Sequence, residues 1–351
     1  MSVINASGWP TVEAKAVGID TGALADAAEF VRQNNSTCFL VAHASGLVCA
    51  EHWHCEEGFG GDKSPLAPTF TDDDRSLEDV ASAQKSVVSV LVGIAVEKGL
   101  LTVTDSVTDL IGPGWSHASS SQESEITVQH LLTMTSGLDH GGRYAEPPGQ
   151  VWMYNLGPAW HTLKRVLPAV AGKPLNDLLR EWLTGPLGMT ESQFVERPVV
   201  PEGRNAIGAS SVHPDGKTFE GFVSSGYDLV RFGQAVCSAV RGEDELGISS
   251  DYFQESLKPS TDLNPSYGYL WWLNGQAFSL APAQKEPNQG PMVPSAPDDM
   301  VSALGALGRA VHVIPSRQLM VVRMGGSPSE QVLAGSQFGV TLFDRLQLRT
   351  D

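Results

Sequence analysis

The stretch that decides the fold is ASAQKSVVSVLVGIAVEKGL, residues 81–100. It predicts a helix from Ser82 to Lys98, because apolar residues lie nearly all round the helical circumference and a glycine then follows. A helix without a polar face is buried in the middle of a domain. The predicted helix begins with the tetrad SAQK, and residues three apart on a helix lie on one face. The Ser82 hydroxyl and the Lys85 amine are therefore expected to meet at the start of a buried helix.

A serine and a lysine in this arrangement have the chemistry of an activated nucleophile. The positive end of the helix dipole and the free N–H groups of the first turn favour the anion that forms on attack. Burial disfavours the ammonium form of a lysine, so Lys85 loses its charge readily and can act as a base. The alternative is a serine at the start of the helix with no catalytic role, followed by a lysine whose amine reaches solvent, since Ser-x-x-Lys also occurs by chance. The tetrad by itself leaves both interpretations open.

The segments on either side of this helix indicate how the chain is organised. Residues 21–33 predict a helix, and residues 38–53 predict a β-hairpin that turns at Ala44-Ser45-Gly46. From the central helix to about residue 260 the signals are mainly helical, with 126–134 and 160–183 as further helices. The chain then returns to β character in RAVHVI (309–314) and QLMVVRM (318–324), and it ends in a helix over about 337–348.

This order predicts an α/β (α+β) fold in one catalytic unit, residues 1–351, with an antiparallel sheet that both ends of the chain build and helices flank. We expect an α/β lobe from about 1–65 and 300–351, and an inserted, mainly helical lobe from about 66–299. Residues 56–75 are predicted to form a loop. Residues 278–299 are rich in proline and polar residues and too long for a plain connection, so they are a candidate lid or insertion.

Composition restricts the partners and the location. The 351 residues include 23 basic and 40 acidic ones, a formal net charge of -17. Such a surface repels phosphate backbones and anionic lipid, so neither nucleic acid nor a membrane is expected as a partner. The N-terminal residues have no basic and apolar pattern of a signal peptide, and four cysteines have no framework-like spacing. We expect a cytoplasmic protein, and the sequence does not predict its oligomeric state.

The sequence predicts neither a metal site nor the nucleophile motif of another hydrolase class. His52 and His54 lie on one face of a predicted strand, but no third ligand can be named, so no metal site is predicted. The sequence contains no Gly-x-Ser-x-Gly, which excludes the nucleophile elbow of the α/β-hydrolases. No cofactor is expected.

The residues around Ser82 resemble a known family. The run from residue 81 to 107 is similar to the first motif and following helix of serine β-lactamase and penicillin-binding-protein-like enzymes. The most similar of these are class C β-lactamases, their esterase relatives and 6-aminohexanoate-dimer hydrolases. Further segments resemble this family in the same order along the chain, over roughly residues 38–345: ITVQHLLTMTSGLDH (126–140), PPGQVWMYNLGPAW (147–160), PLGMTESQF (186–194), SSGYDLVRFGQ (224–234), SYGYLWWLN (266–274) and ALGALGRAVHVIPSRQLMVVRMG (303–325).

The resemblance implies a role for individual residues. Ser82 matches the nucleophile, Lys85 its base, and Tyr154 the tyrosine that relays a proton to the leaving group, provided that Lys85 favours its phenolate or a shared proton. The third motif falls at residues 303–305, so the backbone N–H groups of Ser82 and Ala306 are expected to form the oxyanion hole. The alternative for Tyr154 is a core aromatic. Candidate substrate-binding residues are Asn155, Tyr144 and Trp271, although Trp271 or its neighbour Trp272 is expected to lie in the core.

Two positions depart from the family pattern. The family usually has an asparagine two residues after the tyrosine, where this chain has Leu156. The third motif usually begins with Lys, His or Trp, where this chain has Ala303. A cation there holds a substrate carboxylate, so both changes weaken a β-lactamase or peptidase interpretation more than an esterase one.

The sequence therefore predicts a serine hydrolase that cleaves a small ester or amide through an acyl-Ser82 intermediate, with carboxylesterase-type activity as the first expectation. One alternative is an acyltransferase, or an amide hydrolase acting on β-lactams or ω-amino-acid oligomers. An alternative of another class is a binding protein that keeps the fold without turnover.

Overall fold

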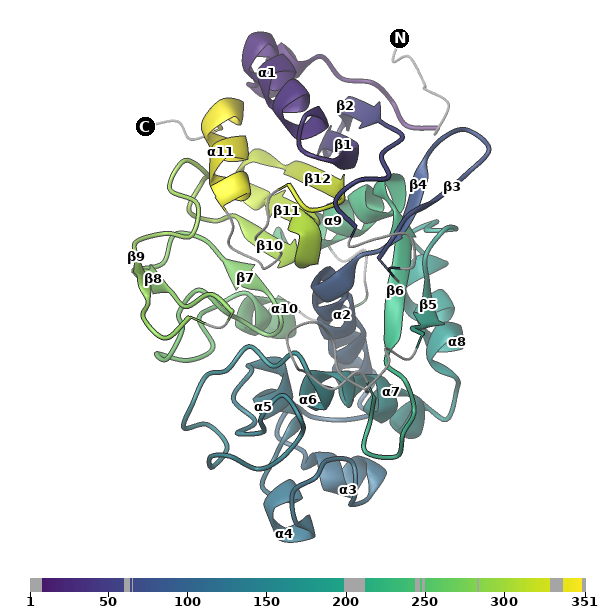
Figure 1. The fold of residues 1–351 in the computed structure, drawn as a ribbon, viewed down its shortest axis with the longest axis vertical. Coiled ribbons are helices and arrows are strands. Elements are labelled where there is room, and N and C mark those ends of the chain that lie inside the picture. The colour runs from purple at the N-terminus through teal and green to yellow at the C-terminus, as the bar shows by residue number, and fades with distance from the viewer. Residues whose placement is uncertain are drawn as a thin grey trace.

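A six-stranded antiparallel sheet joins the two ends of the chain (Figure 1). The computed structural model describes residues 8–59, 64, 66–198, 212–243, 247, 250–282, 284–328 and 337–348. The strand order is β2-β1-β12-β11-β10-β7, in which the strands are β1 Ser36–His43, β2 Gly46–His52, β7 Trp272–Leu273, β10 Val301–Leu304, β11 Ala310–Ile314 and β12 Leu319–Gly325. This confirms the predicted α+β fold with its two hairpins. The edge strand β7 comes from within the range that was assigned to the helical lobe.

Strand β1 is buried on both faces, because helices cover the sheet on each side. Phe39 and Val41 pack with helices α1 (Thr21–Arg32) and α11 (Gln337–Leu346). Leu40 and Ala42, which alternate with them, belong to the core that contains α9 (Gly226–Val240) and the central helix. A strand covered on both sides has a continuous run of apolar residues, and β1 has one in residues 38–42 (CFLVA).

The central helix is the element on which the prediction depended. It begins as a 3-10 turn, η2 (Ala81–Ala83), and continues as α2 (Gln84–Glu97). Residues 84 to 95 are all buried, as the absence of a polar face predicted. Figure 1 shows α2 in the middle of the molecule, between the six-stranded sheet and the helices α3 to α7.

The lobe below the sheet is less purely helical than predicted. Its helices are α3 (Val107–Ile111), α4 (Ser120–Glu123), α5 (Val128–Leu132), α6 (Pro158–His161), α7 (Leu163–Ala171), α8 (Leu175–Leu179) with a π-helical turn (Arg180–Thr184), and α10 (Ser250–Ser256). A second sheet of order β3-β4-β6-β5 lies beside them, formed by β3 Thr69–Phe70, β4 Ser76–Asp79, β5 Gln193–Glu196 and β6 Glu220–Ser225. The predicted helix over 160–183 is interrupted at Gly172, which takes a left-handed conformation and ends α7, and at Pro174.

The candidate lid forms a small hairpin that is tied to the body of the protein. Its strands are β8 (Phe278–Ser279) and β9 (Asn288–Gln289). The Asn274 side chain donates to the carbonyl oxygens of Val293 and Pro297 and accepts from the N–H of Val293. These bonds fix the returning half of the segment before it enters β10.

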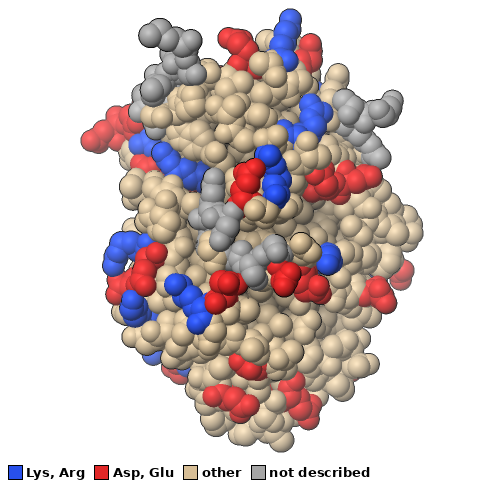
Figure 2. All heavy atoms as spheres, turned by 180° about the vertical axis from the view of Figure 1, so that it is seen from behind, with Lys and Arg blue, Asp and Glu red and all other residues tan. Residues whose placement is uncertain are grey.

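Charged side chains are mixed on the face shown in Figure 2. Basic and acidic residues are interspersed across its middle, and acidic ones alone appear at its lower end. In the described parts of the chain, no helix is long and apolar enough to cross a membrane.

Candidate active site

Ser82 lies in the short 3-10 turn that precedes α2. Ala81, immediately before it, has a left-handed backbone (φ 51°), which costs free energy in a residue other than glycine. The Asp79 carboxylate accepts the Ala81 N–H at 2.8 Å and so holds this conformation. Ser82 is half-buried between two buried alanines. The turn thus presents the hydroxyl at an accessible surface of an otherwise closed core.

Lys85 lies directly against the candidate nucleophile. Its Nζ is 3.0 Å from Ser82 Oγ and forms a hydrogen bond with it. The amine is buried and sits over two aromatic rings, 4.5 Å from the centroid of Tyr154 and 4.3 Å from that of Trp160. Burial, followed by the positive charges of Arg197 and Lys164, lowers the pKa of Lys85 well below its usual value. A neutral amine in contact with a hydroxyl is the arrangement a general base requires.

Tyr154 completes a hydrogen-bonded group of three side chains. Its hydroxyl is hydrogen-bonded to Ser82 and to the indole of Trp272. Burial raises the pKa of Tyr154 to about 12, although these two hydrogen bonds act in the opposite direction. This raised pKa opposes a phenolate near pH 7, and the alternative of a proton shared with Lys85 stays a prediction. The hydroxyl can still pass a proton while remaining neutral.

Strand β10 brings the third motif against the turn of Ser82. Gly305 follows β10, and a Cβ atom added to it would lie only 2.3 Å from the Val80 carbonyl oxygen and 3.3 Å from the Ala83 nitrogen. Residue 305 must therefore be glycine for the two backbones to approach this closely. The 3-10 turn that follows, η5 (Ala306–Gly308), lies against η2, and Ser82 and Ala306 are both half-buried. This is the arrangement expected for a pair of oxyanion-hole N–H groups.

The surroundings of Tyr154 are aromatic and apolar. Trp152, Tyr154, Tyr267 and Trp272 contact one another through their rings, with centroids between 4.9 and 6.3 Å apart. Trp272 reaches this group because β7 pairs it with Ser302 of β10. The two positions that depart from the family pattern are apolar in their environment as well: Ala303 is buried, and Leu156 is half-buried beside the core.

Two of the three predicted substrate-binding residues are buried. Trp271 is fully buried and stacks on Phe232 of α9, which makes it the core tryptophan of the two, and the indole of Trp272 is the one hydrogen-bonded to Tyr154. Asn155 is buried, and its amide nitrogen donates to the carbonyls of Leu138 and Asp139. Its amide nitrogen is therefore engaged by the backbone, and substrate contacts by Trp271 and Asn155 stay predictions.

The third, Tyr144, lies on the loop after α5. Its hydroxyl is 3.4 Å from a carboxylate oxygen of Glu125, and its ring packs against the core. A substrate contact by Tyr144 stays a prediction.

Two ion pairs hold the strand that leads to Ser82, one with a half-buried arginine and one fully buried. Arg197 binds the Asp79 carboxylate with two hydrogen bonds of 2.7 and 2.8 Å. Glu78 pairs with Arg309 at 2.8 Å, and both side chains are fully buried. Arg309 follows the third motif, so this pair joins the Ser82 strand to the oxyanion-hole segment. Buried pairs of this kind contribute fixed geometry more than net stability.

Sequence reasoning missed three parts of this site: Trp272, the Asp79–Arg197 pair and a buried lysine, Lys164. Strand alternation offered a signal for the first, since neighbouring residues on a strand face opposite ways and only one of two tryptophans can face the core. No signal in the sequence pointed to the other two, because Arg197 is 118 residues from Asp79 along the chain and Lys164 is 80 residues from Gln84, to which it donates a hydrogen bond.

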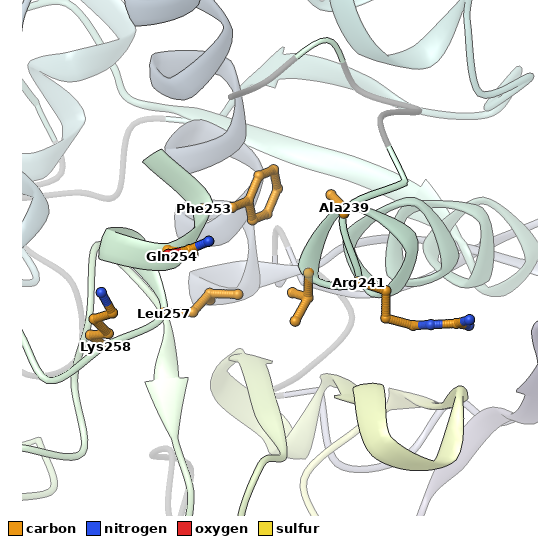
Figure 3. A pocket seen from close by; sticks show the side chains of 8 residues that line it. Ala239, Arg241, Phe253, Gln254, Leu257 and Lys258 are labelled. Carbon is orange, nitrogen blue, oxygen red and sulfur yellow. The ribbon is translucent and has the colours of Figure 1, made fainter. Parts of the chain in front are cut away.

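Other candidate features lie apart from this site. In the described residues, no group of three or more His, Cys, Asp or Glu side chains could hold a metal ion, and His54 stacks on Phe70. A pocket of ≈ 390 Å³ opens between the end of α9 and α10 (Figure 3), and the Ser82 group is not among its lining residues, which are Ala239, Val240, Arg241, Gly242, Phe253, Gln254, Leu257 and Lys258.

Comparison with known proteins agrees with this geometry. The family model described as Beta-lactamase matches residues 59–331. An uncharacterised protein of Alkalihalophilus pseudofirmus is 22% identical over 310 residues, which cover 84% of each chain. Among solved structures, a putative β-lactamase from Bacteroides dorei has a TM-score of 0.63 at 15% identity, covering 93% of this chain and 99% of its own.

A second solved structure, EstCE1, described as a hydrolase with promiscuous acyltransferase activity, also has a TM-score of 0.63. It is 14% identical, and the match covers 93% of this chain and 98% of EstCE1. These structural likenesses concern the fold. The family match spans the nucleophile turn, Tyr154 and the third motif. The chain belongs to the β-lactamase family.

Proposed function

We propose that this protein is a serine hydrolase that cleaves small, uncharged esters through an acyl-Ser82 intermediate. The observation that carries the proposal is the 3.0 Å contact between Ser82 Oγ and the buried amine of Lys85. Elsewhere in the described chain Lys164 is also buried, but it binds a glutamine, a carbonyl and a carboxylate, whereas Lys85 binds a hydroxyl. A general base must lie close to the proton that it accepts, and the Lys85 amine lies next to the Ser82 hydroxyl.

Ser82, Lys85 and Tyr154 each take part in the acylation step. Lys85 Nζ accepts the Ser82 hydroxyl proton while Oγ attacks the ester carbonyl carbon. The negative charge that develops on the carbonyl oxygen is held by the backbone N–H groups of Ser82 and Ala306. When the tetrahedral intermediate collapses, the Tyr154 hydroxyl donates its proton to the departing alkoxide, and Lys85 returns a proton to Tyr154. An alcohol leaves, and the acyl group remains on Ser82.

Deacylation repeats these steps with water. Water loses a proton to the Lys85–Tyr154 pair and attacks the acyl carbon, and the same N–H groups hold the oxyanion. Ser82 Oγ leaves and regains its proton, and a carboxylic acid is released. Because Tyr154 has a raised pKa, it acts as a neutral relay, and Lys85 is the group whose protonation stops the reaction.

The preference for uncharged esters rests on the apolar positions around the site. Ala303 offers no cation to a substrate carboxylate, and Leu156 offers no amide to a peptide or β-lactam side chain. The aromatic group around Tyr154 favours an acyl or alkyl chain instead. The likeness to EstCE1 adds an acyltransferase as a second candidate, in which an added alcohol replaces water.

The experiment that tests this function compares ester and β-lactam substrates. We expect kcat/KM for p-nitrophenyl acetate or butyrate to exceed that for nitrocefin at least about tenfold, because one missing charged contact costs on the order of 1.4 kcal/mol or more. The Ser82→Ala protein serves as the blank. A higher kcat/KM for nitrocefin would show that the assignment of Ala303 and Leu156 to substrate preference is wrong.

The same assay separates the remaining alternatives. Addition of a primary alcohol to the ester reaction gives a new ester if the protein is an acyltransferase and gives only acid if it is a hydrolase. A chain that binds the esters but turns none of them over would support a binding protein that keeps the fold.

A further inference from the structure

A second buried lysine lies beside the catalytic group, on a different element. Lys164 is the second residue of α7, and its side chain is fully buried. Its Nζ lies 5.3 Å from the centroid of the Trp160 ring, and Lys85 Nζ lies 4.3 Å from the same centroid. Two lysine amines thus share one indole ring inside the core. An arrangement that places two potential cations together in the interior is costly, and it needs a reason.

Lys164 is bonded to the turn that carries Ser82. Its Nζ donates to Gln84 Oε1 at 3.3 Å, and the Gln84 amide in turn donates to the carbonyl of Ala81 at 3.1 Å. Ala81 is the strained residue immediately before Ser82. On its other side Lys164 donates to the Glu220 carbonyl and lies 3.4 Å from a Glu220 carboxylate oxygen. A chain of contacts therefore runs from β6 through Lys164 and Gln84 to the nucleophile turn.

The other groups that face Lys85 leave Lys164 as the proton acceptor near neutral pH. Tyr154 and Ser82 contribute hydroxyl groups that carry no charge, and Arg197 is paired with Asp79. His161, the last residue of α6, stays neutral because burial lowers its pKa well below the usual range. Burial also lowers the pKa of Lys164, to about 7, while the Glu220 carboxylate opposes that shift.

We propose that Lys164 is a positioning residue of the Ser82 site: it anchors the nucleophile turn through Gln84 and, as the protonated partner beside Trp160, keeps Lys85 in its neutral, basic form. This inference rests on the proposed function. As the pH falls through about 7, Lys164 takes up the first proton from solvent. A second positive charge on Lys85, beside the same ring, is then disfavoured by like-charge repulsion in a region of low dielectric. Strand β10 supplies no such cation, since Ala303 stands there.

The test follows the rate at which a fluorophosphonate probe labels Ser82, measured from about pH 5 to pH 9. This readout needs no knowledge of the natural substrate. In Lys164→Met, Lys85 takes up the first proton, so we expect the acidic limb of the profile to move to higher pH by on the order of one unit. The plateau at high pH should fall as well, because the turn has lost its link through Gln84.

Three further variants make the result decisive. Lys164→Met combined with Glu220→Gln removes the carboxylate that would otherwise be left unpaired, and the same upward shift is expected. Arg165→Met removes a neighbouring, half-buried cation of α7 that pairs with Asp215 at 3.3 Å and is not hydrogen-bonded to Gln84, and no shift is expected. If Lys164→Met does not fold, as judged by a melting curve, Lys164→Gln carries the test with the same expected shift.

An acidic limb that coincides with that of the wild type in the folded Lys164 variants would overturn the inference. That outcome is distinct from failure of the proposed function, which would appear as labelling or ester turnover that persists in Ser82→Ala.

Discussion

At the scale of single residues, the candidate site joins two groups whose surroundings shift their ionisation. Burial lowers the pKa of the Lys85 amine well below its usual value and raises the pKa of the Tyr154 phenol to about 12. In the proposed mechanism these shifts suit Lys85 to act as a base beside Ser82 Oγ and Tyr154 to act as a proton donor toward the leaving group. The pair resembles other active sites in which environment, and not residue type alone, sets the roles.

The role of Tyr154 separates catalysis from packing. If the hydroxyl relays protons, Tyr154→Phe should lower kcat by on the order of a hundredfold or more and change KM much less, because the proton moves in the transition state. Steady-state kinetics on p-nitrophenyl butyrate measure both constants.

A matched control is Tyr252→Phe. Tyr252 is also buried, and its hydroxyl donates to the Ser89 carbonyl at 2.8 Å, one helical turn or more along α2. This change should reduce stability by about 1 kcal/mol and leave kcat within a few fold. A folded Tyr154→Phe protein with kcat equal to that of the Tyr252→Phe control would remove Tyr154 from the mechanism.

The sequence predicted residue pairs better than residue environments. Ser82 and Lys85 lie three apart on one helix, so local geometry alone brings them together. Asn155 stood next to the expected substrate-binding position, yet its amide is consumed by two backbone carbonyls from a distant loop. Such competition for hydrogen bonds depends on the tertiary fold and leaves no local pattern in the sequence.

At the scale of elements, the site depends on how closely β10 approaches the start of α2. The approach is limited by Gly305, whose missing side chain leaves room for the Val80 carbonyl. The central helix was predictable because it is apolar on all sides, whereas β7 was not, since two residues are too few to show alternation. The short strands β5 and β6 were missed for a similar reason, as they lie within a region of mainly helical signals.

Gly305→Ala tests this approach. The added Cβ would lie 2.3 Å from a backbone oxygen, which cannot move aside as a flexible side chain would. We expect β10 to shift away from Ser82 and one oxyanion-hole donor to be misplaced, so that kcat/KM falls about a hundredfold.

Gly339→Ala in α11 is the control, because its Cβ meets nothing within 4 Å and it has a helical setting. It should leave activity unchanged and stability equal or slightly higher. Full activity in Gly305→Ala would mean that the oxyanion is held by groups other than Ser82 and Ala306.

At the scale of the whole molecule, the site is assembled from segments that are far apart in the chain. Ser82 and Lys85 come from the central helix, Tyr154 from the helical lobe, and Gly305 from the strand that returns toward the C-terminus. The buried Glu78–Arg309 pair links the strand before Ser82 to the segment after Gly305. The six-stranded sheet was predictable in outline, because most of its β signals lie at the two ends of the chain.

The large-scale electrostatics agree with an uncharged substrate. The net charge of -17 repels anionic substrates at long range, and no compensating cation stands at position 303. The basic side chains seen in Figure 2 are dispersed among acidic ones. Neutral esters approach such a surface without an electrostatic penalty, whereas the carboxylate of a penicillin is repelled by it.

The central claim, that the whole chain is built to carry an acyl group on Ser82, is tested most directly by intact-protein mass spectrometry after treatment with a fluorophosphonate. The account predicts one adduct per chain on Ser82 in the wild type and in Ser89→Ala, a buried serine of the same helix, and no adduct in Ser82→Ala. Removing such a nucleophile lowers the rate by several orders of magnitude. A wild-type chain that takes up no probe, or a Ser82→Ala chain that is labelled as fast as the wild type, would contradict it.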